Sequence, residues 1–359
     1  MPDTPRPSER IPGLDVLRGL AAAAVVAFHF TTRFGIVFGH PVAPRFLVPW
    51  GQHGVEVFFV VSGFAIGLSL ESTSTAYDFL VSRALRLYPT FWAALAVTFA
   101  VVGVFGLPDR AVSPLDALLN LTMIPASLGA HAVDAVYWTL ERELRFYGFV
   151  LLILALGLRR YAVHALLLAV AVQTVDAVSH RVPHLVADLL NVHWAHLFAC
   201  GALLARSRRA PSWKTAGLLA LCIASSRLVG KVPFAYGAVA VALVWLATRP
   251  FIGARARPLI FLGKISYPLY LVHQYVGYVV MRVLYAHGAP PSVAILSACA
   301  VALALATALH VLVEEPCLAL LRRRRRAPGP ALAEPLEGGA FARQRSSGRR
   351  RAMRAANAA

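Results

Sequence analysis

The chain has 359 residues and a net charge of +18; 58% of its residues are hydrophobic and only 14% are charged. Soluble domains carry about 25% charged residues, so this composition excludes a disordered chain and argues against a soluble globular protein. The arginines cluster between apolar runs and near the C-terminus, which favours membrane topology over nucleic-acid binding as the reason for the positive charge.

Long apolar runs recur from residue 14 to residue 321. A spanning helix with its loop takes about 30 residues, so the sequence predicts an all-α, polytopic integral membrane protein with about ten transmembrane helices. A short amphipathic segment near 114–124 is expected at a surface. The predicted helices cover residues 13–32, 52–70, 88–107, 142–158, 162–178, 189–205, 215–230, 234–248, 264–285 and 292–318.

Positive charge is distributed unequally over the two ends of these helices. With the N-terminus in the cytoplasm, the cytoplasmic segments hold 19 lysines and arginines before the tail, against 7 on the opposite side. The positive-inside rule therefore predicts a multi-pass protein of the inner (plasma) membrane with both termini cytoplasmic. The N-terminus lacks a signal-peptide pattern, so we expect the first helix to be retained.

The chain is expected to divide into three parts: a cytoplasmic segment (1–12), a transmembrane domain (13–321) and a basic tail (322–359). The tail is rich in arginine, alanine, proline and glycine, with little hydrophobic periodicity. It is expected to be disordered and to rest on anionic membrane lipids.

The four cysteines lie inside or at the edge of apolar stretches. They are Cys200, Cys222, Cys299 and Cys317. Their spacing matches neither a metal motif nor a disulfide framework, so we expect no metal site.

Three ionisable residues lie in the first predicted helix, where a charge costs a few kcal/mol and needs a reason. They are Asp15, Arg18 and His29. At about 100° per residue, Arg18 and His29 fall on one helix face, separated by roughly 16 Å along the axis. This spacing predicts a polar seam, although a membrane anchor for Arg18 and an interhelical hydrogen bond for His29 remain alternative explanations.

The second and third predicted helices add further charges. Glu56 lies near the outer end of the second helix, at a depth close to that of His29, and Gly63 and Gly67 predict close helix packing. Arg83 and Arg86, at the inner end of the third helix, share a face. They are either topological anchors or a site for phosphate groups from the cytosol.

The fourth predicted helix begins with the sequence YWTLERELRFYGF. Glu143 is expected near its outer end, at a depth similar to that of His29. Because acidic residues favour helix N-termini, an ion-paired helix start is the alternative to a functional carboxylate.

A polar stripe runs along the ninth predicted helix, where Ser266, Tyr270 and His273 are spaced i, i+4, i+7. The tenth helix ends with the sequence VLVEEPCLALLRRRRR, which places Glu314 near the inner boundary. We include these residues in the predicted seam.

Together, these motifs resemble the acyltransferase 3 family of integral membrane acyltransferases. The resemblance covers about residues 12–322, and Glu56 and Thr139 stand where the family often has Asp and Ser. It depends on six motifs in the same order: LDVLRGLAAAAVVAFH, GVEVFFVVSGF, the R-x-x-R-x-x-P run of Arg83, Arg86 and Pro89, WTLERELRFY, LGKISYPLYLVH, and the EEP ending.

The resemblance implies transfer of an acyl group, usually acetyl, from acyl-CoA to a hydroxyl group. Acyl-CoA would be a donor substrate rather than a bound cofactor, and the acceptor a cell-surface carbohydrate or, alternatively, a polyketide such as a macrolide. It marks Arg18 and His29 as the central pair and Glu143 as a further essential acid. Less directly, it supports roles for Arg83, Arg86, Tyr270 and His273.

These expectations combine into a mechanistic hypothesis. His29 would act as general base or as a transient acyl carrier, with Glu143 orienting it or sharing its proton. The donor would enter from the cytoplasm with its phosphates near Arg83 and Arg86, and the acceptor would approach from the other side. A membrane transporter and a non-catalytic scaffold are the alternative functions.

Overall fold

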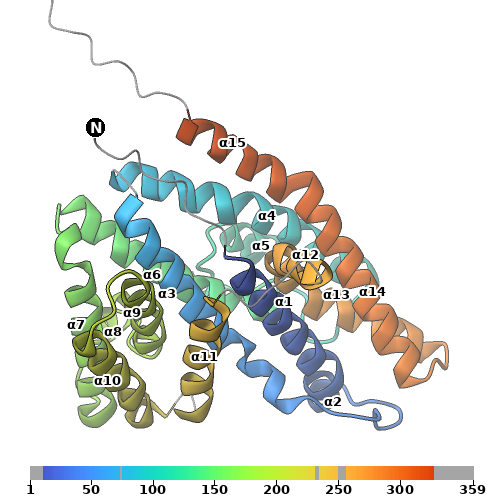
Figure 1. The fold of residues 1–359 in the computed structure, drawn as a ribbon. Coiled ribbons are helices and arrows are strands. Elements are labelled where there is room, and N and C mark those ends of the chain that lie inside the picture. The colour runs from blue at the N-terminus through green and yellow to red at the C-terminus, as the bar shows by residue number, and fades with distance from the viewer. Residues whose placement is uncertain (1–10, 73–74, 231–233, 250–255, 327–359) are drawn as a thin grey trace, which may run out of the picture. The chain divides into compact units, whose positions relative to one another are not determined.

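The computed structural model describes residues 11–72, 75–230, 234–249 and 256–326, and no β-strand occurs among them (Figure 1). The all-helical prediction is therefore confirmed for the described residues. The α-helices are α1 (Pro12–Ala27), α2 (Phe34–Val37), α3 (Gly54–Ser72), α4 (Ala76–Phe105), α5 (Pro114–Asn120), α6 (Trp138–Ala155), α7 (Ala162–Ser179), α8 (His184–Leu189), α9 (Ala195–Arg209), α10 (Trp213–Val229), α11 (Phe234–Ala247), α12 (Arg257–Lys264), α13 (Ser266–Ala286), α14 (Pro291–Leu309) and α15 (Glu315–Arg326).

Tighter and wider helical turns supplement these helices. The 3₁₀ segments that matter for the site are η2 (Pro49–His53) and η4 (Ala135–Tyr137). Two π-helical segments, η1 (Phe28–Arg33) and η7 (His310–Glu314), continue α1 and α14 without a break. π-helical turns are rare and often occur at functional sites.

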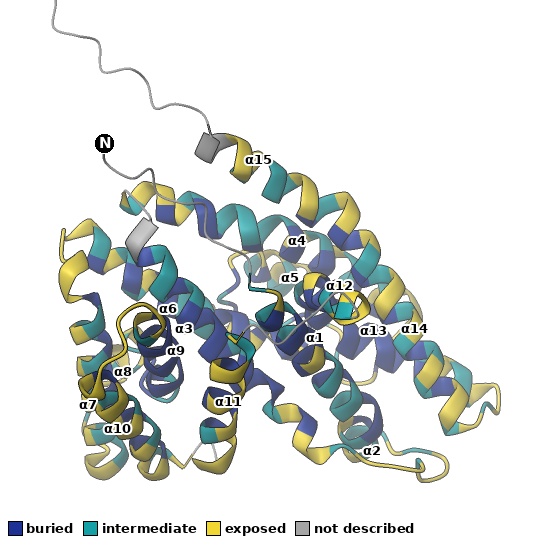
Figure 2. Cartoon of the chain, in the orientation of Figure 1, coloured by how far each residue is buried: buried dark blue, intermediate teal, exposed yellow. Residues whose placement is uncertain are grey.

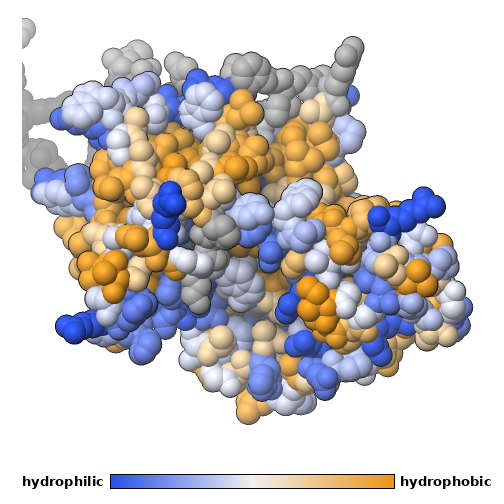
Figure 3. All heavy atoms as spheres, turned by 90° about the horizontal axis from the view of Figure 1, so that it is seen from below, coloured by the Kyte–Doolittle hydropathy of each residue, from blue (hydrophilic) through white to orange (hydrophobic). Residues whose placement is uncertain are grey.

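Five segments of the described chain are long and apolar enough to cross a membrane, so the predicted number of about ten spans is not confirmed. They are Pro12–Val37, Pro49–Leu70, Ala76–Phe105, Arg159–Ser179 and Pro291–Arg323. Other predicted spans are helical but short or rich in charge: α6 carries Glu141, Arg142, Glu143 and Arg145 near its start. Hydrophobic side chains cover large areas of the face shown in Figure 3.

Some helices begin or end at residues other than the predicted ones, and at the start of α4 the reason is an N-cap residue. The helix expected from residue 88 begins at Ala76, because the Thr75 side chain accepts a hydrogen bond from the Asp78 backbone N–H, as N-caps do. Arg83 and Arg86 consequently lie within α4. The helix expected at 264–285 corresponds to α13, and the short helix α12 precedes it.

The chain forms two compact units, residues 1–318 and 319–359. All site residues described below lie in the first unit. Of the predicted terminal parts, residues 1–10 and 327–359 lie outside the described residues.

Helices α3 and α9 pack with their backbones in contact. A Cβ atom on Gly63 would lie 2.1 Å from the Phe198 carbonyl oxygen, and one on Gly201 would lie 2.0 Å from that of Val60. Only glycine permits this approach, which is the small-residue packing predicted for α3. Residues 195–205 of α9 are all buried, as the dark blue of Figure 2 shows.

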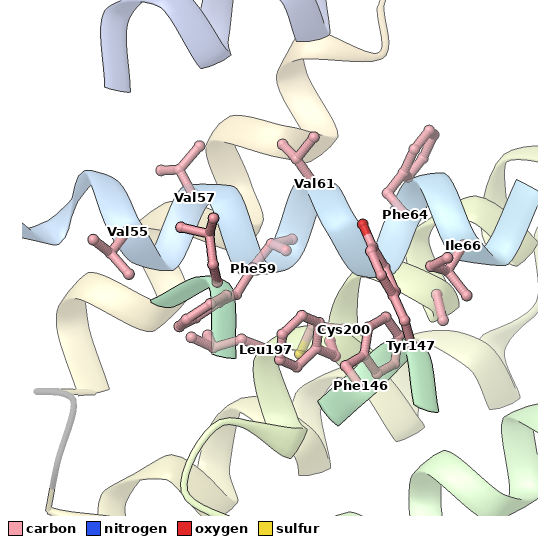
Figure 4. Packing of buried hydrophobic residues seen from close by; sticks show 14 of the residues in the cluster. Val55, Val57, Phe59, Val61, Phe64, Ile66, Phe146, Tyr147, Leu197 and Cys200 are labelled. Carbon is pink, nitrogen blue, oxygen red and sulfur yellow. The ribbon is translucent and has the colours of Figure 1, made fainter. Parts of the chain in front are cut away.

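An aromatic and aliphatic cluster fixes α3, α6 and α9 to one another (Figure 4). The Phe146 ring stacks on Phe198 with centroids 4.1 Å apart, and Phe59 packs against Phe198 at 5.0 Å. In Figure 4, the hydroxyl of Tyr147 extends toward α3. This packing brings one polar face of α6 against α3.

The remaining site helices pack around α1. This helix contacts α3, α11, α12 and α13, and α13 packs in turn against α4 and α14. Polar residues from five helices therefore meet in the interior of the bundle.

Candidate active site

Two cavities lie inside the bundle, and each contains one member of the predicted Arg18–His29 pair. The Arg18 cavity has a volume of about 80 Å³ and the His29 cavity about 370 Å³. The polar residues of the Arg18 cavity are Arg18, Ser62, Arg83, Arg86, Thr139, Glu143, Tyr147, Ser266, Tyr267 and Tyr270. Those of the His29 cavity are His29, Arg33, Gln52, His53, Glu56, Tyr270 and Gln274, with Trp138 and Trp194 beside them.

The two cavities meet at Tyr270 and Val55, which line both. Arg18 and His29 therefore open into adjoining cavities rather than into one uninterrupted seam. The Tyr270 hydroxyl donates to the Val136 carbonyl at 3.2 Å and accepts from Thr139 at 2.9 Å. These bonds hold the Tyr270 ring between the two cavities.

The Arg18 cavity is rich in positive charge. Three arginines line it, against a single carboxylate, that of Glu143. Asp15 and Glu314, both predicted members of the seam, interact electrostatically with Arg18. Ser266, another predicted member, donates its hydroxyl to the Gly263 carbonyl at 2.7 Å. Among the lining side chains the guanidinium groups outnumber the carboxylate, and this arrangement is suited to an anionic ligand.

Arg83 is held by both polar and aromatic partners. Its Nη2 donates to the Ser69 hydroxyl at 2.7 Å, and its guanidinium lies over the rings of Phe79 and Tyr147, 5.4 and 5.3 Å from their centroids. The Arg83 Nε atom is buried without a hydrogen-bond partner. This leaves one donor for a ligand, beside Arg86 on the same helix face.

Glu143 is bound by hydroxyl groups rather than by a cation. Its Oε1 accepts a 2.7 Å hydrogen bond from Ser62 and another from the Tyr147 hydroxyl. The ion-paired helix start that was the alternative for Glu143 is made by Glu141 instead, which lies 2.7 Å from Arg145. The two neighbouring carboxylates therefore have different environments.

The structure does not place Glu143 against His29. Glu143 lines the Arg18 cavity and not the His29 cavity, and its hydrogen bonds go to Ser62 and Tyr147. The physical reason is the packing of α6 on α3, which points Glu143 at Ser62.

His273 is the residue that contacts His29. Its Nε2 lies 3.1 Å from His29 Nδ1, and its own Nδ1 lies 2.9 Å from the Tyr270 carbonyl oxygen. A carbonyl only accepts hydrogen bonds, so His273 Nδ1 carries the proton and its Nε2 is the acceptor in the neutral ring.

The same reasoning fixes the tautomer of His29. Its Nδ1 lies between two acceptors, His273 Nε2 and the Val25 carbonyl oxygen at 2.9 Å. Nδ1 therefore carries the proton, and His29 Nε2 is left unprotonated with no hydrogen bond to any described residue. This nitrogen belongs to a ring that lines the His29 cavity, and a neutral imidazole nitrogen of this kind can accept a proton.

Two acceptor atoms of the His29 cavity lining have no partner. Glu56 Oε2 and Gln274 Oε1 are buried without a hydrogen bond among the described residues. The other Glu56 oxygen accepts from His53 Nδ1 at 2.9 Å. Unpaired buried acceptors are costly, and a ligand bearing hydroxyl groups would satisfy them.

A buried carboxylate that was not among the predicted site residues binds the backbone of α13 just after His273. Asp134 accepts hydrogen bonds from the backbone N–H of Tyr275 at 3.0 Å and of Val136 at 3.2 Å. Burial raises the pKa of Asp134 to about 7, against the opposing effect of these backbone donors. Asp134 and Tyr270 thus fix α13 on both sides of His273.

Several predicted residues have partners that the sequence did not identify. Ser62 and Tyr147 hold Glu143, and His53 holds Glu56. The helical spacings of Tyr147 from Glu143 (i+4) and of His53 from Glu56 (i−3) were available signals. Asp134 lies in a loop, where no periodicity could reveal it.

Comparison with known proteins gives the chain a family. The acyltransferase 3 family, described as an acyltransferase domain, matches residues 11–311. Acyltransferase MdmB from Streptomyces mycarofaciens is 29% identical over 381 residues, which cover 90% of this chain and 97% of that protein. Exopolysaccharide production protein ExoZ from Rhizobium meliloti (strain 1021) is 33% identical over 105 residues, 27% of this chain and 32% of that protein.

A third relative, nodulation protein 10 from Rhizobium leguminosarum bv. viciae, is 27% identical over 177 residues, covering 44% of this chain and 48% of that protein. No solved structure matches the chain significantly. Because the family match spans nearly the whole apolar region, the chain belongs to the acyltransferase 3 family and is an acyl-transferring enzyme of the membrane.

Proposed function

We propose that this enzyme moves an acetyl group from acetyl-CoA to a hydroxyl group of a cell-surface carbohydrate. The observation that carries the proposal is the His29–His273 pair, which leaves His29 Nε2 unprotonated in the lining of a large cavity. Acyl transfer to an alcohol needs a group that accepts the hydroxyl proton, and a neutral imidazole does this at neutral pH.

In the proposed reaction, the acceptor hydroxyl oxygen attacks the thioester carbonyl carbon. His29 Nε2 takes the hydroxyl proton as the C–O bond forms and the C–S bond breaks. The proton then passes to the departing CoA thiolate, which leaves as the thiol. His29 Nδ1–H keeps its bond to His273 throughout, so the ring stays oriented.

The Arg18 cavity is the proposed site of the donor. Its three guanidinium groups match the negative charge of CoA phosphates. The cavity is narrow, with a volume of about 80 Å³. We propose that the slim thioester arm passes through it toward Tyr270 and that the phosphates stay at the arginine end.

The His29 cavity is the proposed site of the acceptor. Its volume of about 370 Å³ lies in the range of small-molecule sites, roughly 300–1,000 Å³. The unpaired Glu56 Oε2 and Gln274 Oε1 would accept hydrogen bonds from sugar hydroxyl groups. The name of the relative ExoZ, an exopolysaccharide production protein, agrees with a carbohydrate acceptor.

The proposed setting is the inner membrane, crossed about ten times, with both termini in the cytoplasm. The unequal distribution of arginine and lysine supports this orientation. Donor and acceptor would then approach from opposite sides and meet near Tyr270.

The test is a transfer assay with the purified full-length protein in lipid nanodiscs. Radiolabelled acetyl-CoA is supplied with carbohydrate extracted from the bacterial surface, and labelled ester is measured for the wild type and for His29→Ala. Label in the carbohydrate that disappears in the variant supports the proposal. Label that remains on the protein without acceptor would identify an acyl-imidazole carrier, and wild-type protein that transfers no label refutes the function.

A further inference from the structure

A third cavity lies beside the His29 cavity and is almost entirely apolar. It has a volume of about 380 Å³ and is lined by residues of α1, η2, α3 and α11. Its only polar side-chain atoms belong to Trp50, His53 and Tyr236. We call it the α1–α11 groove.

The α1–α11 groove opens at the surface of the bundle. Leu20, Val239 and Leu243, which line it, are 48%, 54% and 39% exposed. Two of its walls belong to Pro12–Val37 and Pro49–Leu70, which are long and apolar enough to cross a membrane, and a third, α11, is a shorter apolar helix. In a bilayer, the open side of the groove therefore faces hydrocarbon chains rather than water.

His53 connects the groove to the His29 cavity because it lines both. One face of its ring stacks on Tyr236, with centroids 3.5 Å apart and planes 11° from parallel. Its Nδ1 donates to Glu56 in the His29 cavity. The apolar groove thus ends at His53, which positions Glu56 and its unpaired Oε2 atom.

We propose that the α1–α11 groove binds the aliphatic chain of the acceptor, so that the acceptor is an amphiphile with a hydroxyl-bearing head and a long hydrocarbon chain. The chain lies along α1 and α11, and the head enters the His29 cavity beside His53 and Glu56. This inference rests on the proposed function, since it names the class of molecule that brings the hydroxyl to His29.

The position of the groove next to the His29 cavity, with His53 lining both, favours this occupant over a bulk phospholipid. A phospholipid chain gains from the apolar walls alone and has no use for unpaired acceptors at the groove's end. An amphiphile with hydroxyl groups gains from both regions, and its head would satisfy Glu56 Oε2 and Gln274 Oε1.

The test uses a dodecyl glucoside with a photoreactive diazirine in its chain, added to the full-length protein in phosphatidylcholine nanodiscs. Cross-linked peptides are mapped by mass spectrometry. We expect saturable labelling of residues 17–24 and 236–243, reduced by unlabelled dodecyl glucoside but only weakly by methyl glucoside. Equal, unsaturable labelling of α7 and α11 would show that bulk lipid fills the groove and would overturn the inference.

Two matched variants sharpen the test. Val239→Trp places an indole in the groove and should lower labelling by roughly fivefold, because the indole takes the space that the chain needs. Val175→Trp on α7, at a valine of similar exposure (57% against 54%), should leave labelling unchanged. Labelling that survives Val239→Trp contradicts the groove as the site.

The labelling experiment tests the groove, and the transfer assay tests the proposed function, so one proposal can be refuted without the other. Cross-linking needs no chemistry, so His29→Ala should still be labelled in the groove. Saturable labelling without any transfer to glucosides would refute the proposed function and leave the binding site standing. Transfer to methyl and dodecyl glucoside with the same KM would refute the chain site and leave the function standing.

Discussion

The two interior cavities differ in size, charge and polar groups, although α1 contributes to both. The Arg18 cavity is small and lined by three guanidinium groups, while the His29 cavity is several times larger and contains an unprotonated imidazole nitrogen and unpaired acceptors. The first has the properties of an anion-binding site and the second those of a reaction site. The difference indicates that donor binding and chemistry can be separated by mutation.

The largest effect is expected for His29→Ala. Loss of a general base lowers kcat by roughly 10²–10⁴-fold. The Arg18 cavity is left intact, so binding of acyl-CoA, measured by calorimetry, should stay near the wild-type value. His164→Ala, at an exposed histidine of α7, is the control and should keep full activity. Equal loss of donor binding and of kcat would show that the cavities do not act separately.

Arg86→Ala should mainly change donor binding and have a smaller effect on kcat, the reverse of the effect expected for His29→Ala. Removing one guanidinium weakens the contact with phosphate and should raise the KM for acyl-CoA by about tenfold, equivalent to ~1.4 kcal/mol, with a smaller change in kcat. Steady-state kinetics with varied donor measures both. Arg159→Ala removes an exposed arginine and serves as control; a fall confined to kcat would refute the phosphate role of Arg86.

His273→Ala tests the tautomer of His29. Without His273 Nε2 as an acceptor, the His29 ring loses one of its two orienting bonds and keeps the one to the Val25 carbonyl. We therefore expect kcat to fall by about tenfold, the equivalent of one hydrogen bond of ~1.4 kcal/mol. His273→Gln offers an amide oxygen in place of the ring nitrogen and should recover part of the rate. Identical pH–rate profiles and rates for the wild type and His273→Ala would show that His273 has no part in orienting His29.

The smallest effect is expected at Asp134, which supports α13 from outside both cavities. Burial raises its pKa to about 7, above the ordinary value of 3.8, so ionisation destabilises the folded state more than the unfolded state. The favourable contribution of Asp134 to the free energy of unfolding is therefore complete below the ordinary pKa of 3.8. It decreases as the pH rises and is lost at about pH 7.

Asp134→Asn removes this titration and keeps an acceptor for the Tyr275 N–H. We expect the difference between the Tm of the variant and the Tm of the wild type to increase by roughly 2–4 °C from pH 5 to pH 8. Asp109→Asn, at an exposed turn, should show no such trend. A constant Tm difference across this range would exclude the raised pKa.

Sequence periodicity predicted the positions of those helices that have an apolar middle and polar residues at both ends. It did not separate the short helix α12 from α13, and the predicted spans over α6 and α13 stay unconfirmed, because the polar residues of the site weaken the hydropathy signal there. It could place Arg18 and His29 on one helix, since their spacing is local. The i→i+5 turns of η1 then change the direction of His29 relative to an ideal α-helix.

The partners of the site residues depended on tertiary packing. Glu143 meets Ser62 because glycines let α9 approach α3 and aromatic rings fix α6 against both. His29 meets His273 across 244 positions of sequence. No pattern within one helix specifies which side chain of another helix faces it, so the sequence supplied candidates and the packing selected the pairs.

The carbonyl contacts of His273 determine where positive charge can reside. When His29 gains a second proton, its Nδ1–H still points at His273 Nε2, and His273 Nδ1–H points at the Leu269 and Tyr270 carbonyl oxygens, 3.1 and 2.9 Å away. The imidazolium is therefore stabilised by the Val25 carbonyl and, through the His273 ring, by backbone dipoles of α13 instead of by a carboxylate. These dipoles are fixed in position, so they need not reorient when the cation forms.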